Sequence, residues 1–130
     1  MSQRTPEGRL TAKMIALLNA QPRTHAHKVH SAGYGSNGEP DIDCVMRGRA
    51  VKLEVKMPGT EASIRRRVTP LQRAKLQTYY DAGAIVGVVT SLEELELLCL
   101  HPLDATPDVV AQLDVLRARA GIAPHSDSAT

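Results

Sequence analysis

Aromatic side chains are nearly absent from this 130-residue chain, which has no Trp, no Phe and only three Tyr. The core therefore has to be built from aliphatic side chains, and hydrophobic residues make up an ordinary 42% of the sequence. The scarcity of rings also argues against a dedicated single-strand-binding protein, because such proteins stack unpaired bases on aromatic side chains.

Cysteine is scarce and long apolar runs are absent. The two cysteines, Cys44 and Cys99, lie far apart and match no metal-ligand spacing. We therefore expect two buried, reduced thiols of a cytosolic protein. No apolar run is long enough to span a membrane, and the polar start over residues 1–5 is unlike a signal peptide. These absences predict a cytoplasmic protein with no membrane partner.

The formal net charge is only +2, but it is unevenly spread along the chain. Residues 1–75 carry 14 Lys and Arg against 6 Asp and Glu, whereas residues 76–130 carry 2 against 8. Such an asymmetry predicts a polyanionic partner at one face of the protein. For the acidic second half we infer only packing and solubility.

Chain length predicts one domain over residues 1–122, followed by a disordered tail over 123–130. Apolar spacing and caps predict helices at 5–19, at 69–81, from 91 and at 108–120, and strands at 24–30, 41–46, 50–56 and 85–89. A tight turn at 47–49 joins two of the strands, and loops cover 31–39 and 58–68. This order predicts an α/β sandwich with a mixed sheet.

The most informative stretch is Pro40-Asp41, followed about a dozen residues later by Glu54-Val55-Lys56. Alternate strand residues share a face, so Glu54 and Lys56 point one way while Val55 points to the core. If the two strands pair, Asp41 lies beside Glu54. Two carboxylates suit Mg²⁺ or Mn²⁺, and Lys56 adds an ammonium group. The pattern predicts a divalent-metal site beside a scissile phosphate.

Four elements in this order resemble the PD-(D/E)xK nuclease superfamily and, within it, the virus-type replication-repair nuclease (VRR-NUC) domain. Pro40-Asp41 matches the PD, residues 54–56 match the ExK, Thr69-Pro70-Leu71-Gln72 matches "(T/S)-P-x-Q", and residues 82–89 match the glycine and strand that follow. The resemblance runs from residue 5 to about residue 94. It implies a restriction-endonuclease-like fold, in which helices flank a central mixed sheet in the order α-β-β-β-α-β-α.

The resemblance also implies roles for particular residues. Asp41, Glu54 and the backbone carbonyl of Val55 would hold Mg²⁺ or Mn²⁺. Lys56 would orient or deprotonate the attacking water, or neutralise the transition state. Gln72 would lie beside this lysine, and Glu7 on the first helix would reach the metal through water. Two plainer interpretations stay open: an exposed helix glutamine, and an acid that favours the helix dipole.

Basic residues around the expected site are candidates for nucleic-acid contacts. Arg65, Arg66 and Arg67 lie in the loop predicted at 58–68, and each guanidinium can grip two phosphate oxygens. Lys28, Lys52 and Arg73 are weaker candidates of the same kind. A solvated run of charge is the alternative interpretation.

Several other polar residues carry weaker signals. Asp43 shares a face with Asp41 and could bind a second ion, but we favour a solvated carboxylate. Tyr79 and Tyr80 fit helix packing. The histidines at 25, 27 and 30 match no standard zinc spacing, so we do not expect a zinc site.

The leading hypothesis is a Mg²⁺-dependent endonuclease that hydrolyses phosphodiester bonds in DNA. Family resemblance extends this to branched DNA cut by a homodimer, as in junction resolvases, inside a bacterial cell or a phage-infected host. The alternative is a nuclease-fold DNA-binding module that has lost catalysis and works as an accessory factor. A third interpretation is a basic scaffold whose carboxylates are merely solvated.

Overall fold

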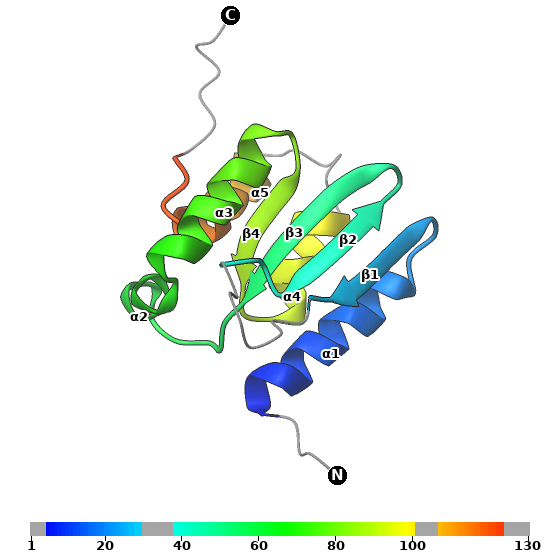
Figure 1. The fold of residues 1–130 in the computed structure, drawn as a ribbon, viewed down its shortest axis with the longest axis horizontal. Coiled ribbons are helices and arrows are strands. Elements are labelled where there is room, and N and C mark those ends of the chain that lie inside the picture. Colours follow the sequence, from blue (N-terminus) through cyan, green and yellow to red (C-terminus); the bar gives the residue numbers. More distant parts are fainter. Residues whose placement is uncertain (1–4, 30–37, 101–106, 124–130) are drawn as a thin grey trace, which may run out of the picture.

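The structure is a computed structural model that describes residues 5–29, 38–100 and 107–123. These residues form a four-stranded mixed sheet with helices on both faces (Figure 1). The elements are α1 (Pro6–Asn19), β1 (Thr24–Lys28), β2 (Ile42–Met46), β3 (Arg49–Val55), α2 (Glu61–Arg67), α3 (Pro70–Asp81), β4 (Ile85–Val89), α4 (Leu92–Leu95), η1 (Glu96–Leu100) and α5 (Pro107–Ala118). The predicted α/β fold with a mixed sheet is confirmed.

The sheet has the strand order β1-β2-β3-β4. The first three strands run antiparallel as a meander, and β4 is parallel to β3. The turn between β2 and β3 consists of Arg47 and Gly48, whose φ angles are +49° and +83°. Positive φ at both central residues is the requirement of a type I′ hairpin turn, which matches the twist of the flanking strands. The turn fixes the register in which β2 and β3 pair.

Helices cover the two faces of the sheet unequally. On one face α1, α4, η1 and α5 enclose an aliphatic core, centred on Met14, Leu18, Leu53 and Leu95. On the other face α3 packs mainly against β3 and β4, over a smaller core that contains Leu76. Burial alternates in β1 and β2, whereas every residue of β4 is buried. One face of β1 and β2 is therefore open beside α3.

The structure corrects two expectations about helices. Residues 58–68 were predicted as a loop, but Glu61–Arg67 form α2, with Thr60 as N-cap and Ile64 buried beneath. A single buried apolar residue in a run of charges is too little periodicity to predict a helix. The helix opened by Ser91 continues as the π-helix η1, a form with no sequence signature. His30 and the predicted tail beyond residue 123 lie outside the described residues. So does Tyr34, which the sequence places in the predicted loop at 31–39, where it would touch substrate or pack locally.

Both cysteines are buried and free, as expected, and burial raises the pKa of the Cys44 thiol to about 11 and that of Cys99 to about 12. In the part of the chain that the structure describes, no helix is both long and apolar enough to cross a bilayer.

One buried arginine ties the helices to the sheet. Arg119, 4% exposed, donates two hydrogen bonds to Glu61 at 2.8 and 2.9 Å and two to Glu94 at 2.8 and 2.9 Å. It also donates to the carbonyl of Val88 at 3.0 Å. The carbonyl of Val89 accepts a hydrogen bond from the N–H of Lys56, the residue after β3, so the carbonyl of Val88 points to the other side of β4. Arg119 therefore closes this edge of the sheet.

The ion pairs of Arg119 set the ionisation of its partners. Its hydrogen bonds hold the pKa of Glu61 below the usual value. Burial alone would raise the pKa of Glu94, but hydrogen bonds from Arg119 and Thr90 outweigh it and leave the pKa below the usual value. Carboxylates with lowered pKa values stabilise the fold at pH values above 4.5, the ordinary pKa of a glutamate. This stabilisation is lost as the pH falls below 4.5.

We expect Arg119→Leu to lower the free energy of unfolding at pH 7 by about 3 kcal/mol, because two carboxylates and a buried carbonyl lose their partner. Urea denaturation measures the loss. Arg66→Ala, at an exposed position on α2, is the control and should change stability by less than about 0.5 kcal/mol. The difference in unfolding free energy between wild type and Arg119→Leu should become smaller below pH 4.5. A loss no larger than that of the control would contradict the assignment.

Candidate active site

The start of β2 and the end of β3 bring two carboxylates together. Ile42 pairs with Leu53, so Asp41 lies opposite Glu54 on the same face. Asp41 Oδ2 accepts a hydrogen bond from the backbone N–H of Val55 at 2.9 Å. In a strand the carbonyl of a residue points to the same side as its N–H, so the Val55 carbonyl also faces the Asp41 side.

Glu54 is the most deeply buried of these groups, at 2% exposure. Its Oε2 accepts a hydrogen bond from Gln72 Nε2 at 3.0 Å and lies 3.4 Å from Lys56 Nζ. Its Oε1 is buried and has no hydrogen-bond partner among the described residues. Burial and the negative charge of Asp41 raise the pKa of Glu54 to about 8, against the opposing effect of Lys56. The carboxylate therefore lacks part of the positive charge that would stabilise its ionised form.

Lys56 follows directly after β3 and is the cation of this cluster. Its side chain is only 13% exposed, because it lies against Glu54 instead of extending into solvent. The charged face formed by Lys52, Glu54 and Lys56 is thus mostly buried beside α3, so Glu54 is not merely solvated as the scaffold interpretation requires.

Gln72 connects the first turn of α3 to Glu54. Its backbone N–H donates to the Thr69 hydroxyl at 3.1 Å, and its side-chain oxygen accepts from the Thr69 N–H at 2.9 Å, which completes a capping box. Because the oxygen is engaged in the cap, the amide nitrogen is the end directed at Glu54. The cap thereby orients the side chain that holds Glu54.

A glycine brings the segment before Asp41 against α3. Gly38 has φ +75°, and a Cβ atom there would lie 2.4 Å from the Leu71 carbonyl carbon and 2.7 Å from the Gln72 nitrogen. Only a residue without a side chain permits this approach. The segment that ends in Asp41 and the helix turn that carries Gln72 are therefore in direct contact.

Glu7 lies in the first turn of α1, at the end of the sheet where β3 and β4 terminate (Figure 1). No hydrogen bond or ion pair joins its side chain to Asp41, Glu54 or Lys56 within the described residues. Its suggested role in the metal site stays a prediction.

The basic candidates divide into two groups. Arg65 and Arg66 are exposed on α2, and Lys28 is exposed on β1. The guanidinium of Arg67 donates to the carbonyls of Met57 at 2.8 Å and Ser63 at 3.3 Å, and that of Arg73 donates to the carbonyl of Arg65 at 3.0 Å. The last two side chains therefore also help to hold the segment between β3 and α3.

A second polar cluster lies beside the first on the open face. Asp43 is not simply solvated, because its Oδ1 lies 2.7 Å from Lys52 Nζ. Tyr79 does more than pack: its hydroxyl donates to Glu39 Oε2 at 2.8 Å, and the Lys52 ammonium lies 4.6 Å from its ring centre. The Asp43–Lys52 pair could have been deduced from the two-residue hairpin, which fixes the register of β2 and β3.

The first cluster fits a divalent cation. The orphaned Glu54 Oε1, the neighbouring carboxylate of Asp41 and a carbonyl on the same side are hard oxygen donors. No group of three His, Cys, Asp or Glu side chains that could hold a metal occurs among the residues described. Mg²⁺ keeps several of its waters, so two carboxylates meet its needs.

We expect Gly38→Ala to destabilise the protein by more than about 2 kcal/mol, since both the backbone angle and the contact with Leu71 resist a side chain. Gly48→Ala is the matched control, because Gly48 also has positive φ but a Cβ atom there would meet no atom of the described residues within 4 Å beyond its chain neighbours. That variant should lose only about 1 kcal/mol. If chemical denaturation shows that both variants lose the same unfolding free energy, the contact of Gly38 with α3 does not contribute to stability.

Comparison with known proteins gives one informative result. No protein-family model matches the chain, and no curated protein matches it in sequence. Among solved structures, the chain is similar to a "VRR_NUC domain", with 26% sequence identity and a TM-score of 0.59. The match covers 76% of this chain and 99% of that structure. Motif order and fold thus agree, and the resemblance to the VRR-NUC domain of the PD-(D/E)xK superfamily is confirmed.

Proposed function

We propose that this protein is a metal-dependent endonuclease that hydrolyses phosphodiester bonds in DNA. The observation that carries the proposal is the buried carboxylate of Glu54, which has an unpartnered oxygen, a second carboxylate beside it and a lysine at 3.4 Å. Similarity to a VRR_NUC domain supports a nuclease-type function in DNA processing. In a basic scaffold protein a carboxylate such as Glu54 would remain exposed to solvent, because burial of an ionised group without full compensation is costly.

Asp41, Glu54 and the Val55 carbonyl are the residues that would hold Mg²⁺ or Mn²⁺. When bound, such an ion lowers the pKa of a coordinated water and neutralises charge on the phosphate. Gln72 keeps Glu54 in place through its 3.0 Å hydrogen bond, and Glu7 would add an acidic side chain from α1. Lys56, held against Glu54, would orient or deprotonate the attacking water, or neutralise the transition state.

The DNA partner is proposed from charge and placement. The basic residues concentrate in the first 75 positions, which include the carboxylate site. Arg65 and Arg66 are free to contact phosphates from α2, and Lys28 could do so from β1, while Arg67 and Arg73 would contribute with their remaining N–H groups. A homodimer acting on branched DNA, as a junction resolvase does, follows from family analogy.

We expect Mg²⁺ to stabilise the protein more strongly at pH 9 than at pH 6. With its pKa at about 8, Glu54 is mostly protonated at pH 6, and a cation must displace that proton. Thermal unfolding with Mg²⁺ or EDTA across this pH range measures the effect. Glu54→Gln should abolish it, whereas Glu96→Gln, at an exposed position, should preserve it. If Mg²⁺ stabilises the protein equally at all pH values and in Glu54→Gln, then Glu54 is not a ligand of the metal.

The decisive test is cleavage of labelled four-way junction, flap, duplex and single-stranded DNA with Mg²⁺, Mn²⁺ or EDTA. We expect metal-dependent cutting that falls at least 100-fold in Asp41→Ala and Lys56→Ala, because these residues touch the reacting groups. Asp81→Ala and Lys13→Ala change residues of the same types outside the site and should cut normally. No cutting on any substrate, with DNA binding intact, would favour the inactive accessory module instead.

A further inference from the structure

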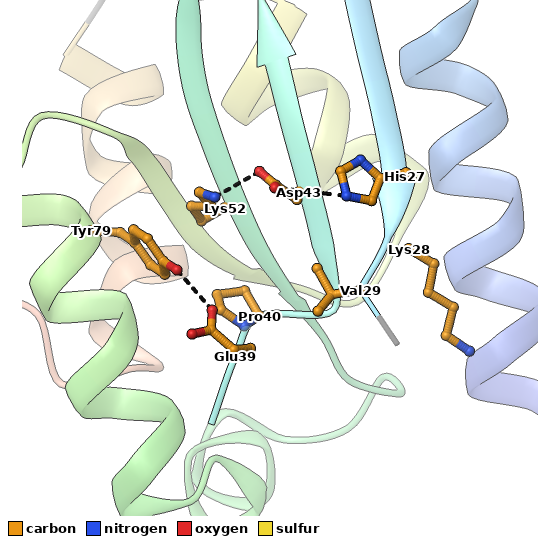
Figure 2. A pocket seen from close by; sticks show the side chains of 8 residues that line it. All are labelled: His27, Lys28, Val29, Glu39, Pro40, Asp43, Lys52 and Tyr79. Carbon is orange, nitrogen blue, oxygen red and sulfur yellow. Dashed lines mark hydrogen bonds and ion pairs between the residues drawn. The ribbon is translucent and has the colours of Figure 1, made fainter. Parts of the chain in front are cut away.

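A polar pocket lies next to the carboxylate site on the open face of the sheet. It has a volume of about 500 Å³, and its lining includes His27 of β1, Asp43 of β2, Lys52 of β3 and Tyr79 of α3. Glu39 and Pro40, which lead into Asp41, close one side (Figure 2). Asp43 is two residues from Asp41, and Lys52 is two residues from Glu54. Two strand residues span about 7 Å, so the pocket adjoins the proposed metal site.

The charge of the pocket does not suit a phosphate. Lys28 borders the pocket, but its side chain extends away from the other lining residues toward α1 (Figure 2). Lys52 is the ammonium that faces the lining carboxylates, and it is already paired with Asp43 at 2.7 Å. Glu39 is engaged by Tyr79 and by Lys75 at 3.2 Å. With these pairs formed, no unpaired positive charge among the described lining residues is directed into the pocket.

Two lining groups are available to a neutral ligand. Asp43 Oδ2 accepts no hydrogen bond from the described residues, and His27 Nε2 lies 3.8 Å from it. The His27 side chain is 55% exposed, so its ring offers a surface for stacking. Tyr79 is less suited to stacking, because the Lys52 ammonium occupies one face of its ring. The pocket thus combines a planar ring with an acceptor at its rim.

We propose that this pocket is a nucleobase subsite, which receives the base of a nucleotide next to the scissile phosphate. The base stacks on His27, and an amino group of the base donates to Asp43 Oδ2. A carboxylate accepts but does not donate, so the base has to present an N–H group; cytosine does so with its amino group, whereas N4,N4-dimethylcytosine does not. This inference rests on the proposed nuclease function, since the metal site defines which nucleotide is the neighbour.

The test is a scan in which each base near the cleaved bond of a single-stranded or branched substrate is replaced in turn by an abasic site. Binding is measured by fluorescence anisotropy in EDTA, and cleavage is measured separately with Mg²⁺. We expect one position beside the cut to lose about 10-fold in affinity, the size of one stacked base, and other positions to lose less than about 2-fold. N4,N4-dimethylcytosine at that position should bind more weakly than cytosine, because its amino nitrogen carries no hydrogen to donate.

Two variants connect the effect to the pocket. His27→Ala should remove the position-dependent loss of affinity, and Asp43→Asn should remove the preference for cytosine over N4,N4-dimethylcytosine. The control is Val45→Ala, because Val45 is exposed on the same face of β2 as Asp43 but does not line the pocket. His25 is less suitable, since its ring centre lies 6.0 Å from that of His27. Val45→Ala should behave as wild type in both assays. Thermal unfolding checks that all three variants are folded.

The outcomes separate this inference from the nuclease proposal. Metal-dependent cleavage without a position-sensitive base would overturn the subsite and leave the nuclease intact. A loss caused by a neutral methylphosphonate linkage, with no loss from the abasic sites, would identify the occupant as a phosphate and overturn the base assignment. Position-sensitive binding without cleavage on any substrate would support the subsite and count against the enzyme.

Discussion

The placement of one carboxylate inside the sheet governs the rest of the site. Glu54 is 2% exposed at the end of β3, where burial and the nearby Asp41 both oppose its ionisation. A cation that binds only the folded protein would relieve this opposition and stabilise the fold as it binds. Gln72 and Lys56 orient and partly neutralise the carboxylate but leave Oε1 without a partner among the described residues. The carboxylates of the site therefore lack part of the positive charge that would stabilise their ionised forms.

Two structural devices keep this carboxylate in position. Gly38 allows the segment before Asp41 to touch the first turn of α3, which carries Gln72, the partner of Glu54. On the far side of β4, Arg119 joins α2, α4 and the residues after α5 through Glu61 and Glu94. The first device sets the geometry of the site, and the second holds the helices against the sheet edge that supports it.

Local signals in the sequence predicted much of this arrangement. Thr5 and Thr69 mark helix starts followed by proline, and both helices begin at that proline. The alternation in residues 50–56 predicted which side chains of β3 reach the core, and Val51, Leu53 and Val55 are fully buried. The predicted loop at 58–68 was wrong, because α2 is stabilised by Ile64 packing in a core that local sequence does not reveal. Arg119 was not predicted, since a charged residue is normally exposed.

The sequence by itself determined the types of chemistry available: an acid after Pro40, an acid and a lysine two residues apart, and a glutamine in a helix cap. Strand alternation and capping are local effects, so these features could be deduced from spacing alone. Only the tertiary structure decided that Glu54 is buried, that Gln72 reaches it, and that a pocket lies beside Asp43. Burial and contact depend on which distant segments pack together, and that packing is a property of the whole fold.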